Sequence, residues 1–149
     1  MRNIKFRVWD IKNQNWIPDN GCLSSSGPLF TLINGKIKRL AAKNHVVQFW
    51  SGLLDKHKNE VYDGDIIKFI YSPGDFAWEY MDDEQRERNL EITGREFIGT
   101  VKSYMPVHDG INLSIVSHSH GLEMIFPISY CQRGEVIGNI FKNGELLKL

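Results

Sequence analysis

Two histidines, His118 and His120, are separated by a single residue, and His108 precedes them in the chain. On a β-strand, residues i and i+2 lie on the same face, so two imidazoles at this spacing could bind one metal ion. The serines that flank the pair, together with Gly121, favour a polar turn between two strands. We therefore expect no metal and no cofactor, and keep His118 and His120 as the candidates for a metal site.

The carboxylates of Asp63 and Asp65 flank Gly64, a spacing that is typical of a tight turn leading into a strand. A hydrolase would need carboxylates that converge from separate elements. We expect Asp65 to accept local backbone hydrogen bonds, so Gly64→Val should destabilise the protein while Asp65→Asn should change its melting temperature little. Cys22 and Cys131 lie outside any Cys-x-x-Cys motif, and the sequence contains no phosphate-binding Gly-rich loop, so no catalytic residue is predicted.

Four cations of the first fifty residues are the candidates for binding nucleic acid: Lys36, Lys38, Arg39 and Lys43. They follow an Asn-Gly dipeptide that predicts a hairpin. Several aromatic residues accompany them in this half of the chain, namely Trp9, Trp16, Phe49 and Trp50. Lysines that neutralise phosphates, beside rings that stack on bases, are typical of small β-barrels that bind single strands. The same rings would also suit a hydrophobic core, so both interpretations stay open.

The composition limits the class of protein. The chain has 149 residues, of which 42% are hydrophobic, and it carries 18 basic and 18 acidic side chains. This length suits one domain with a substantial core and argues against disorder. Two cysteines do not make a disulfide framework, so we expect a reducing cytoplasm. With no run of about 20 apolar residues, the sequence predicts no membrane span.

The neutral total conceals an uneven distribution of charge. Residues 1–50 contain eight basic and two acidic side chains, whereas residues 51–149 contain 10 basic and 16 acidic ones. A basic half could meet an anionic partner, the acidic half of the same molecule, or the acidic half of a second copy. The simplest interpretation combines solvated charges with attraction between the two halves.

Short segments of β-type sequence alternate with turn signals and predict a mainly β fold with a small barrel. Residues 4–9 alternate apolar and basic side chains, and with residues 15–17 they predict an opening hairpin. The Gly-, Ser- and Pro-rich residues 19–28 predict an exposed, mobile loop. The other predicted strands are residues 29–33, 36–40, 45–50 (ended by Ser51 and Gly52), 66–71, 97–101, 111–116, 122–126 and 135–141.

One insertion interrupts the β pattern. Residues 76–91 predict a short exposed helix, because Glu84 and Arg88, and likewise Asp82 and Arg86, are spaced for i,i+4 ion pairs. Residues 75–96 carry most of the acidic excess, with eight acidic side chains and three arginines. We expect an N-terminal β subdomain over residues 1–44 and an SH3-like barrel over residues 45–149 that includes the helical insertion.

Three segments resemble the YopX family. The central one is residues 48–67, QFWSGLLDKHKNEVYDGDII; the others are residues 4–10, IKFRVWD, and residues 135–141, EVIGNIF, followed by ELL at 145–147. The sequence departs from the family pattern at Ser51, where threonine is usual. It also departs at residues 57–59, HKN, which replace an Asn-Gly-Lys turn.

The resemblance implies a mainly β fold with an SH3-like barrel that self-associates, in a phage or prophage protein with no established activity. It supplies no catalytic residue. We expect a non-enzymatic binding module in the bacterial cytoplasm, with a phage or host protein, nucleic acid or a second copy as partner and no membrane association. The alternatives are a homo-oligomeric assembly protein, a weak binder of single-stranded nucleic acid and, last, a small hydrolase or metal enzyme.

Overall fold

The computed structural model describes residues 5–17, 21–23, 29–33, 36–72, 80–103, 113–121 and 123–147. Strands dominate these ranges: β1 (Phe6–Asp10), β2 (Asn15–Trp16), β3 (Gly21–Leu23), β4 (Leu29–Ile33), β5 (Lys36–Leu40), β6 (His45–Leu54), β7 (Glu60–Tyr62), β8 (Asp65–Ile70), β9 (Glu96–Ser103), β10 (Leu113–Ser117), β11 (Met124–Pro127) and β12 (Glu135–Asn139). The helical elements are α2 (Asp83–Ile92) and four 3-10 turns, η1 (Ala42–Asn44), η2 (Ser119–Gly121), η3 (Ile128–Arg133) and η4 (Gly144–Leu147). In these ranges, no helix has both the length and the apolar character needed to cross a membrane.

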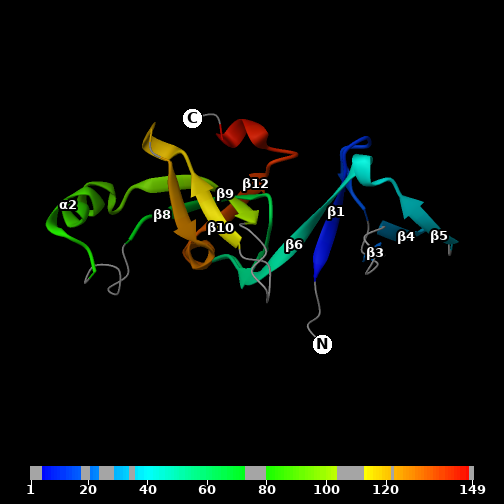
Figure 1. Ribbon diagram of the computed structural model, residues 1–149, viewed down its shortest axis with the longest axis horizontal. Coiled ribbons are helices and arrows are strands. Elements are labelled where there is room, and N and C mark those ends of the chain that lie inside the picture. Colours follow the sequence, from blue (N-terminus) through cyan, green and yellow to red (C-terminus); the bar gives the residue numbers. More distant parts are fainter. Residues whose placement is uncertain are drawn as a thin grey trace.

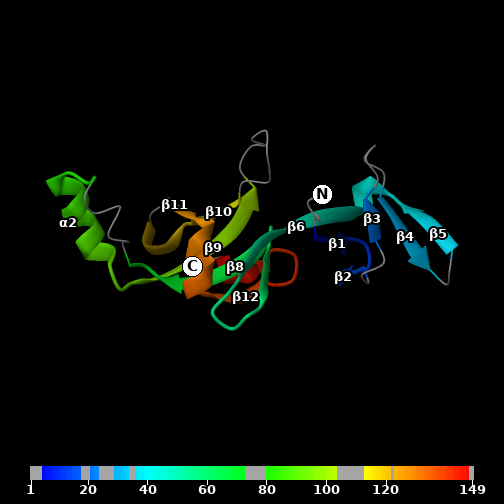
Figure 2. The same cartoon turned by 90° about the horizontal axis from the view of Figure 1, so that it is seen from below.

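The strands form three sheets with the orders β3-β4-β5, β2-β1-β6-β7 and β11-β10-β9-β8-β12. They follow one another along an elongated molecule, with β3–β5 at one end and α2 at the other (Figure 1). The same order is visible from below (Figure 2). The mainly β fold class is therefore confirmed, and its barrel part is the five-stranded sheet, which curls into a half-barrel.

The main hydrophobic core lies on one face of the five-stranded sheet. Because side chains alternate across a strand, Ile67 and Phe69 of β8 share this face with Phe97 of β9 and Ile115 of β10. Stacked and edge-on contacts join the rings of Phe69, Phe97 and Phe126, with centroids 4.9–6.0 Å apart. A second, smaller core packs Val8 of the four-stranded sheet with Leu40 of the three-stranded sheet.

Most predicted strands agree with the structure, and two predictions are wrong. Gly21–Leu23, expected within a mobile loop, forms β3 and pairs with β4, because a neighbouring strand supplies partners for its backbone. β6 does not end at Ser51 but continues to Leu54, with Gly52 at φ +84° inside a register shift. The rest of the predicted loop lies outside the described residues.

The predicted helix is confirmed in position, although it begins later, at Asp83. Residues 73–79 lie outside the described part of the chain. Glu84 pairs with Arg88 as expected, whereas Asp82 is the N-cap and accepts a hydrogen bond from the Gln85 N–H at 2.8 Å. The division predicted between residues 44 and 45 stays a prediction, since β6 begins at His45 and pairs with both β1 and β7.

Candidate functional site

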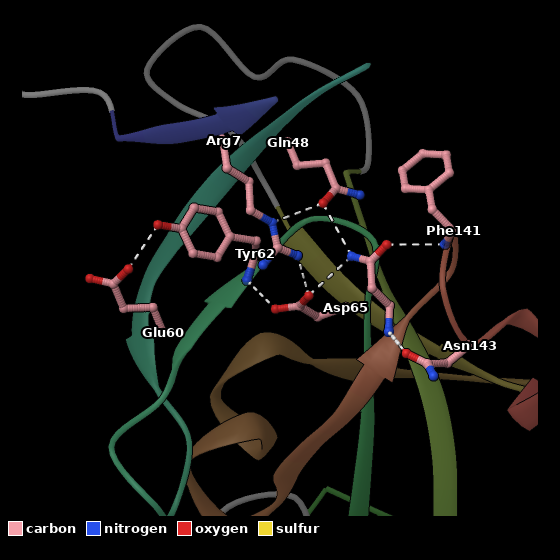
Figure 3. Close-up of polar contacts among 8 residues, drawn as sticks. Arg7, Gln48, Glu60, Tyr62, Asp65, Phe141 and Asn143 are labelled. Atoms are coloured by element: carbon pink, nitrogen blue, oxygen red, sulfur yellow. Dashed lines mark hydrogen bonds and ion pairs between the residues drawn. The ribbon is translucent and has the colours of Figure 1, made fainter. Parts of the chain in front are cut away.

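A buried polar junction joins the four-stranded sheet β2-β1-β6-β7 to the five-stranded sheet. Arg7 lies opposite Gln48 in the β1–β6 pairing, and its Nε donates to Gln48 Oε1 at 3.0 Å. Its Nη2 donates to Asp65 Oδ1 at the start of β8 (Figure 3). The guanidinium lies between the rings of Trp16 and Tyr62, with its central carbon 4.1 and 4.3 Å from their centroids. These contacts engage Arg7 in holding the two sheets together.

Both oxygens of the Asp65 carboxylate accept hydrogen bonds from groups inside the protein. Oδ2 accepts the Tyr62 N–H at 2.8 Å, and Oδ1 accepts Nδ2 of Asn139 at 3.2 Å in addition to Arg7. The side chain is only 2% exposed, and its burial raises the pKa of Asp65 above the usual value, although Arg7 and the hydrogen bonds act in the opposite direction. The predicted turn role of Asp65 is confirmed, and its long-range partners are additional.

Asn139, at the end of β12, completes the junction. Its Nδ2 also donates to Gln48 Oε1 at 3.2 Å, and its Oδ1 accepts the Phe141 N–H at 3.0 Å. Its own N–H donates to Oδ1 of Asn143 at 3.2 Å. One amide side chain therefore links β6 and β8 to the segment that follows β12, and so fixes the position of the C-terminal turns.

The junction also holds the Asp63-Gly64 turn. Gly64 has φ +84°, and a Cβ at this position would lie 2.0 Å from Nε2 of Gln48, so the turn requires glycine for both reasons. The Gly64 N–H donates to the carbonyl of Val101 at 2.8 Å, and its carbonyl accepts the Ile140 N–H at 3.0 Å. The turn is therefore fastened to β9 on one side and to the C-terminal segment on the other.

A groove of about 370 Å³ opens beside this turn, on the sheet face opposite the main core. Its floor is formed by β9 and β10, where Thr100 lies opposite Val116 and both are buried. Ile140 and Leu147 line it from the C-terminal segment, and each is 38% exposed. The volume lies in the range of about 300–1,000 Å³ that is usual for ligand pockets.

Two basic side chains line the groove. Lys102 and His118 are exposed, and neither has an ion pair or hydrogen bond within the part of the chain that the structure describes. Asp63 also lines the groove, but it has an interaction partner of its own. Ser114 lies opposite Lys102 and precedes His118 by four positions, so the two basic residues are roughly 13 Å apart at about 3.3 Å per residue. The two basic residues therefore line well-separated parts of the groove.

The predicted nucleic-acid residues lie far from this groove, at the β3–β5 end of the molecule (Figure 1). Lys36, Arg39 and Lys43 are exposed, whereas the side chain of Lys38 lies outside the described residues. Lys36 and Arg39 are three positions apart in β5, so their side chains leave opposite faces of the strand.

The predicted stacking residues are packed against other side chains. Trp9 is 1% exposed and contacts Trp16 edge-on, with ring centroids 4.9 Å apart. Phe49 packs against Phe6, and the Nζ of Lys5 lies 5.4 Å from the Trp50 ring centroid. The structure therefore supports the core interpretation of these rings, and the four cations stay a prediction.

The structure gives the two candidate metal ligands different surroundings. Ser119–Gly121 forms a 3-10 turn, so the shared strand face expected for His118 and His120 is not formed. His120 has φ 59°, and its Nε2 lies 2.7 Å from the carbonyl oxygen of Glu96. His118 lines the groove. Among the described residues, which exclude His108, no three metal-ligating side chains come together.

Cys131 is fully buried in the main core, and burial raises the pKa of its thiol to about 11. A thiol with this pKa is a poor nucleophile at neutral pH. The side chain of Cys22 lies outside the described residues.

Sequence reasoning missed both the groove and the participation of Gln48 and Asn139 in the junction. One signal was available: residues 98, 100 and 102 alternate with core positions, and so do residues 114, 116 and 118. Their mixed apolar and polar character indicates a half-covered second face of the sheet. The segment that covers it could not be identified from periodicity.

Comparison with known proteins gives a family and a fold. The profile of the family described as YopX protein matches residues 5–148. The crystal structure of protein yopX from Bacillus subtilis is similar with a TM-score of 0.54 and 18% identity, covering 99% of each chain. Protein EF1440 from Enterococcus faecalis has a TM-score of 0.45 and 17% identity, also over 99% of each chain. No curated protein matches the sequence.

Proposed function

This chain belongs to the YopX protein family, and from that premise we propose that it is a non-enzymatic binding module that holds a short apolar segment of a partner protein in its groove. The observation that carries the proposal is an accessible apolar lining in a groove of fixed shape. Ile140 and Leu147 remain 38% exposed although they line a concave surface. Apolar side chains in such a position gain free energy when a ligand removes them from water.

The surroundings of the groove support a preorganised site. The Gly64 turn beside it is fastened by backbone hydrogen bonds to Val101 and Ile140. Behind the turn, the buried network of Arg7 and Asp65 fixes its position. A rigid site loses little entropy when a ligand binds.

The same geometry argues for binding rather than catalysis. The carboxylate of Asp65 is only 2% exposed, it is not part of the groove lining, and both of its oxygens accept hydrogen bonds from within the protein. The backbone positions of Lys102 and His118 are roughly 13 Å apart along the sheet, so the two side chains start from well-separated points of the groove lining.

The test uses an uncharged peptide, acetyl-Ala-Val-Leu carboxamide, titrated into ¹⁵N-labelled protein. We expect chemical shift changes centred on the amides of Thr100, Val116 and Ser119, which belong to the groove. Leu147→Asn should weaken binding roughly three- to sixfold, because it removes part of a leucine surface from the contact. Leu54→Asn is the matched control, since Leu54 is equally exposed at 38% but lies outside the groove. Absence of shifts at the groove, or equal loss in both variants, would show the proposal to be wrong.

A further inference from the structure

Lys102 is an exposed cation that lines the groove. No ion pair reaches it from the described residues. Lys68, in contrast, pairs with Glu135 at 3.0 Å on the same sheet. Asp63 is the acidic residue of the groove, and it already has an interaction partner. Lys102 therefore offers its ammonium group to an anionic part of a ligand.

A hydroxyl lies beside this cation on the same face. Thr100 precedes Lys102 by two positions, so both side chains leave β9 on the groove side, and both line the groove. Thr100 is 4% exposed, and its hydroxyl has no hydrogen-bond partner among residues with described positions. The two Cα atoms are about 7 Å apart along the strand, and the lysine side chain is long enough for the ammonium and the hydroxyl each to donate to one oxygen of a carboxylate.

The apolar lining of the groove indicates which chemical group a ligand must carry beside its carboxylate. Val116 lies directly opposite Thr100, and Leu147 lines the groove from the C-terminal segment. A ligand must therefore present an aliphatic group and a carboxylate close together. The last residue of a polypeptide does so when its side chain is aliphatic, because both groups are attached to one Cα.

The distance between the two basic residues limits the length of the ligand. The roughly 13 Å from Lys102 to His118 corresponds to about four extended residues. At the far end, an N–H of the His118 imidazole can donate to a backbone carbonyl of the ligand.

We propose that the groove binds the C-terminal residues of a partner protein, with the terminal carboxylate at Lys102 and Thr100 and the last aliphatic side chains on the floor. This assignment rests on the proposed function, because it names the chemistry of the segment that the groove holds. The site is a surface one, so the charge adds to an affinity that is mainly apolar.

The test compares three peptides on the ¹⁵N-labelled protein: acetyl-Ala-Val-Leu with a free carboxylate, the same peptide as its carboxamide, and acetyl-Ala-Asp-Leu carboxamide. We expect the free acid to bind about two- to fivefold more tightly than the carboxamide, as is usual for an exposed ion pair. Lys102→Met should reduce this ratio toward one, because only the hydroxyl of Thr100 remains to donate to the carboxylate. Lys12→Met, a substitution of an exposed lysine in the β1–β2 turn, should keep the ratio.

The outcomes separate the two proposals. Equal binding of acid and carboxamide overturns the carboxylate assignment and leaves the groove as an apolar site. Binding of the internal aspartate peptide as tightly as the free acid overturns it in favour of an acidic segment within a chain. If no peptide changes the groove amides, both proposals are wrong.

Discussion

A nearly buried carboxylate and a partly buried guanidinium share one hydrogen-bond network at Asp65 and Arg7, whose side chains are 2% and 24% exposed. Removing one member of such a pair leaves the other without compensation for its lost hydration, at a cost of about 3–5 kcal/mol. An asparagine at position 65 would also turn an N–H group toward the donors of Arg7, Tyr62 or Asn139.

We therefore expect Asp65→Asn to lower the free energy of unfolding by about 1–3 kcal/mol, measured by urea denaturation, mainly because an amide N–H replaces an accepting oxygen in this network. This replaces the mild effect predicted from the turn alone. Asp83→Asn is the control, because that carboxylate is fully exposed in its ion pair with Arg86, and the change should be slight. Equal stability of the two variants would mean that the junction does not hold the sheets together.

Lys58, in the turn between β6 and β7, is one of the described non-glycine residues with a left-handed backbone conformation. Its φ is 67°, a left-handed conformation that costs a residue with a Cβ roughly 1–2 kcal/mol. We expect Lys58→Gly to raise the free energy of unfolding by about 0.5–1 kcal/mol, after the entropy of glycine is subtracted. In thermal denaturation, Lys56→Gly should have the opposite sign, since Lys56 is not among the residues with positive φ. A lower free energy of unfolding in Lys58→Gly would show that the left-handed conformation of Lys58 does not destabilise the fold.

At the scale of the elements, one carboxylate connects the β6–β7 turn to β12. Asp55 is 3% exposed; its Oδ1 accepts the N–H groups of His57 and Asn59, and its Oδ2 accepts the N–H of Val136, each at 2.9 Å. Burial alone would raise the pKa of Asp55, but these hydrogen bonds outweigh it and hold the pKa below the usual value. The β6–β7 turn is thus fixed to the edge of the five-stranded sheet.

The direction of this pKa determines its effect on stability. A carboxyl whose pKa is lower in the folded protein stabilises the fold above its unfolded pKa, near 3.8, and this contribution disappears as the pH falls through the lowered value. The pKa of Asp65 is raised, so its contribution to the free energy of unfolding is greatest at low pH and is lost as the pH rises through the raised value.

Between about pH 5 and pH 2 the free energy of unfolding should fall less in Asp55→Asn than in the wild-type protein. In Asp65→Asn it should fall more, when each variant is compared with its own stability at neutral pH. The measurement is urea denaturation at several pH values. Parallel pH profiles for the two variants would contradict these assignments.

At the scale of the whole molecule, some basic residues of the N-terminal half form ion pairs within the molecule, and others stay exposed at one end of it. Lys5 pairs with Glu60 and Arg7 with Asp65, so some basic residues of the N-terminal half are neutralised within the molecule by acidic residues of the other half. The exposed cations of β5 and η1, however, lie at one end of the molecule, and α2 lies at the other (Figure 2). Attraction between these two ends is therefore possible only between copies.

We expect the protein to self-associate weakly, end to end, at about 0.01 M salt and to be monomeric at about 0.15 M, because the screening length falls from about 30 to 8 Å. Sedimentation velocity at several protein concentrations measures this. Neutralising Glu87 and Glu91 of α2 with glutamine should reduce the association, whereas Glu123→Gln, at an exposed site outside α2, should not. A monomer at both salt concentrations would refute it.

Local patterns in the sequence determined the strands, the Gly64 turn and the acidic helix. Alternation, Asn-Gly and Asp-Gly turns and i,i+4 charges depend on residues a few positions apart, so the chain alone reveals them. Only the tertiary structure decided which polar residues meet. Gln48 and Asn139 are 91 positions apart, and neither carries a local signal of its role in the junction.

The groove is likewise a product of tertiary packing. Lys102 and His118 are unremarkable positions on β9 and after β10, and become a candidate site because the C-terminal segment crosses the same face. That crossing depends on the hydrogen bonds of Gly64 to Val101 and Ile140, which join three distant parts of the chain. Sequence patterns determine which face of a strand is apolar, whereas the folded backbone alone decides what covers that face and where it stays open.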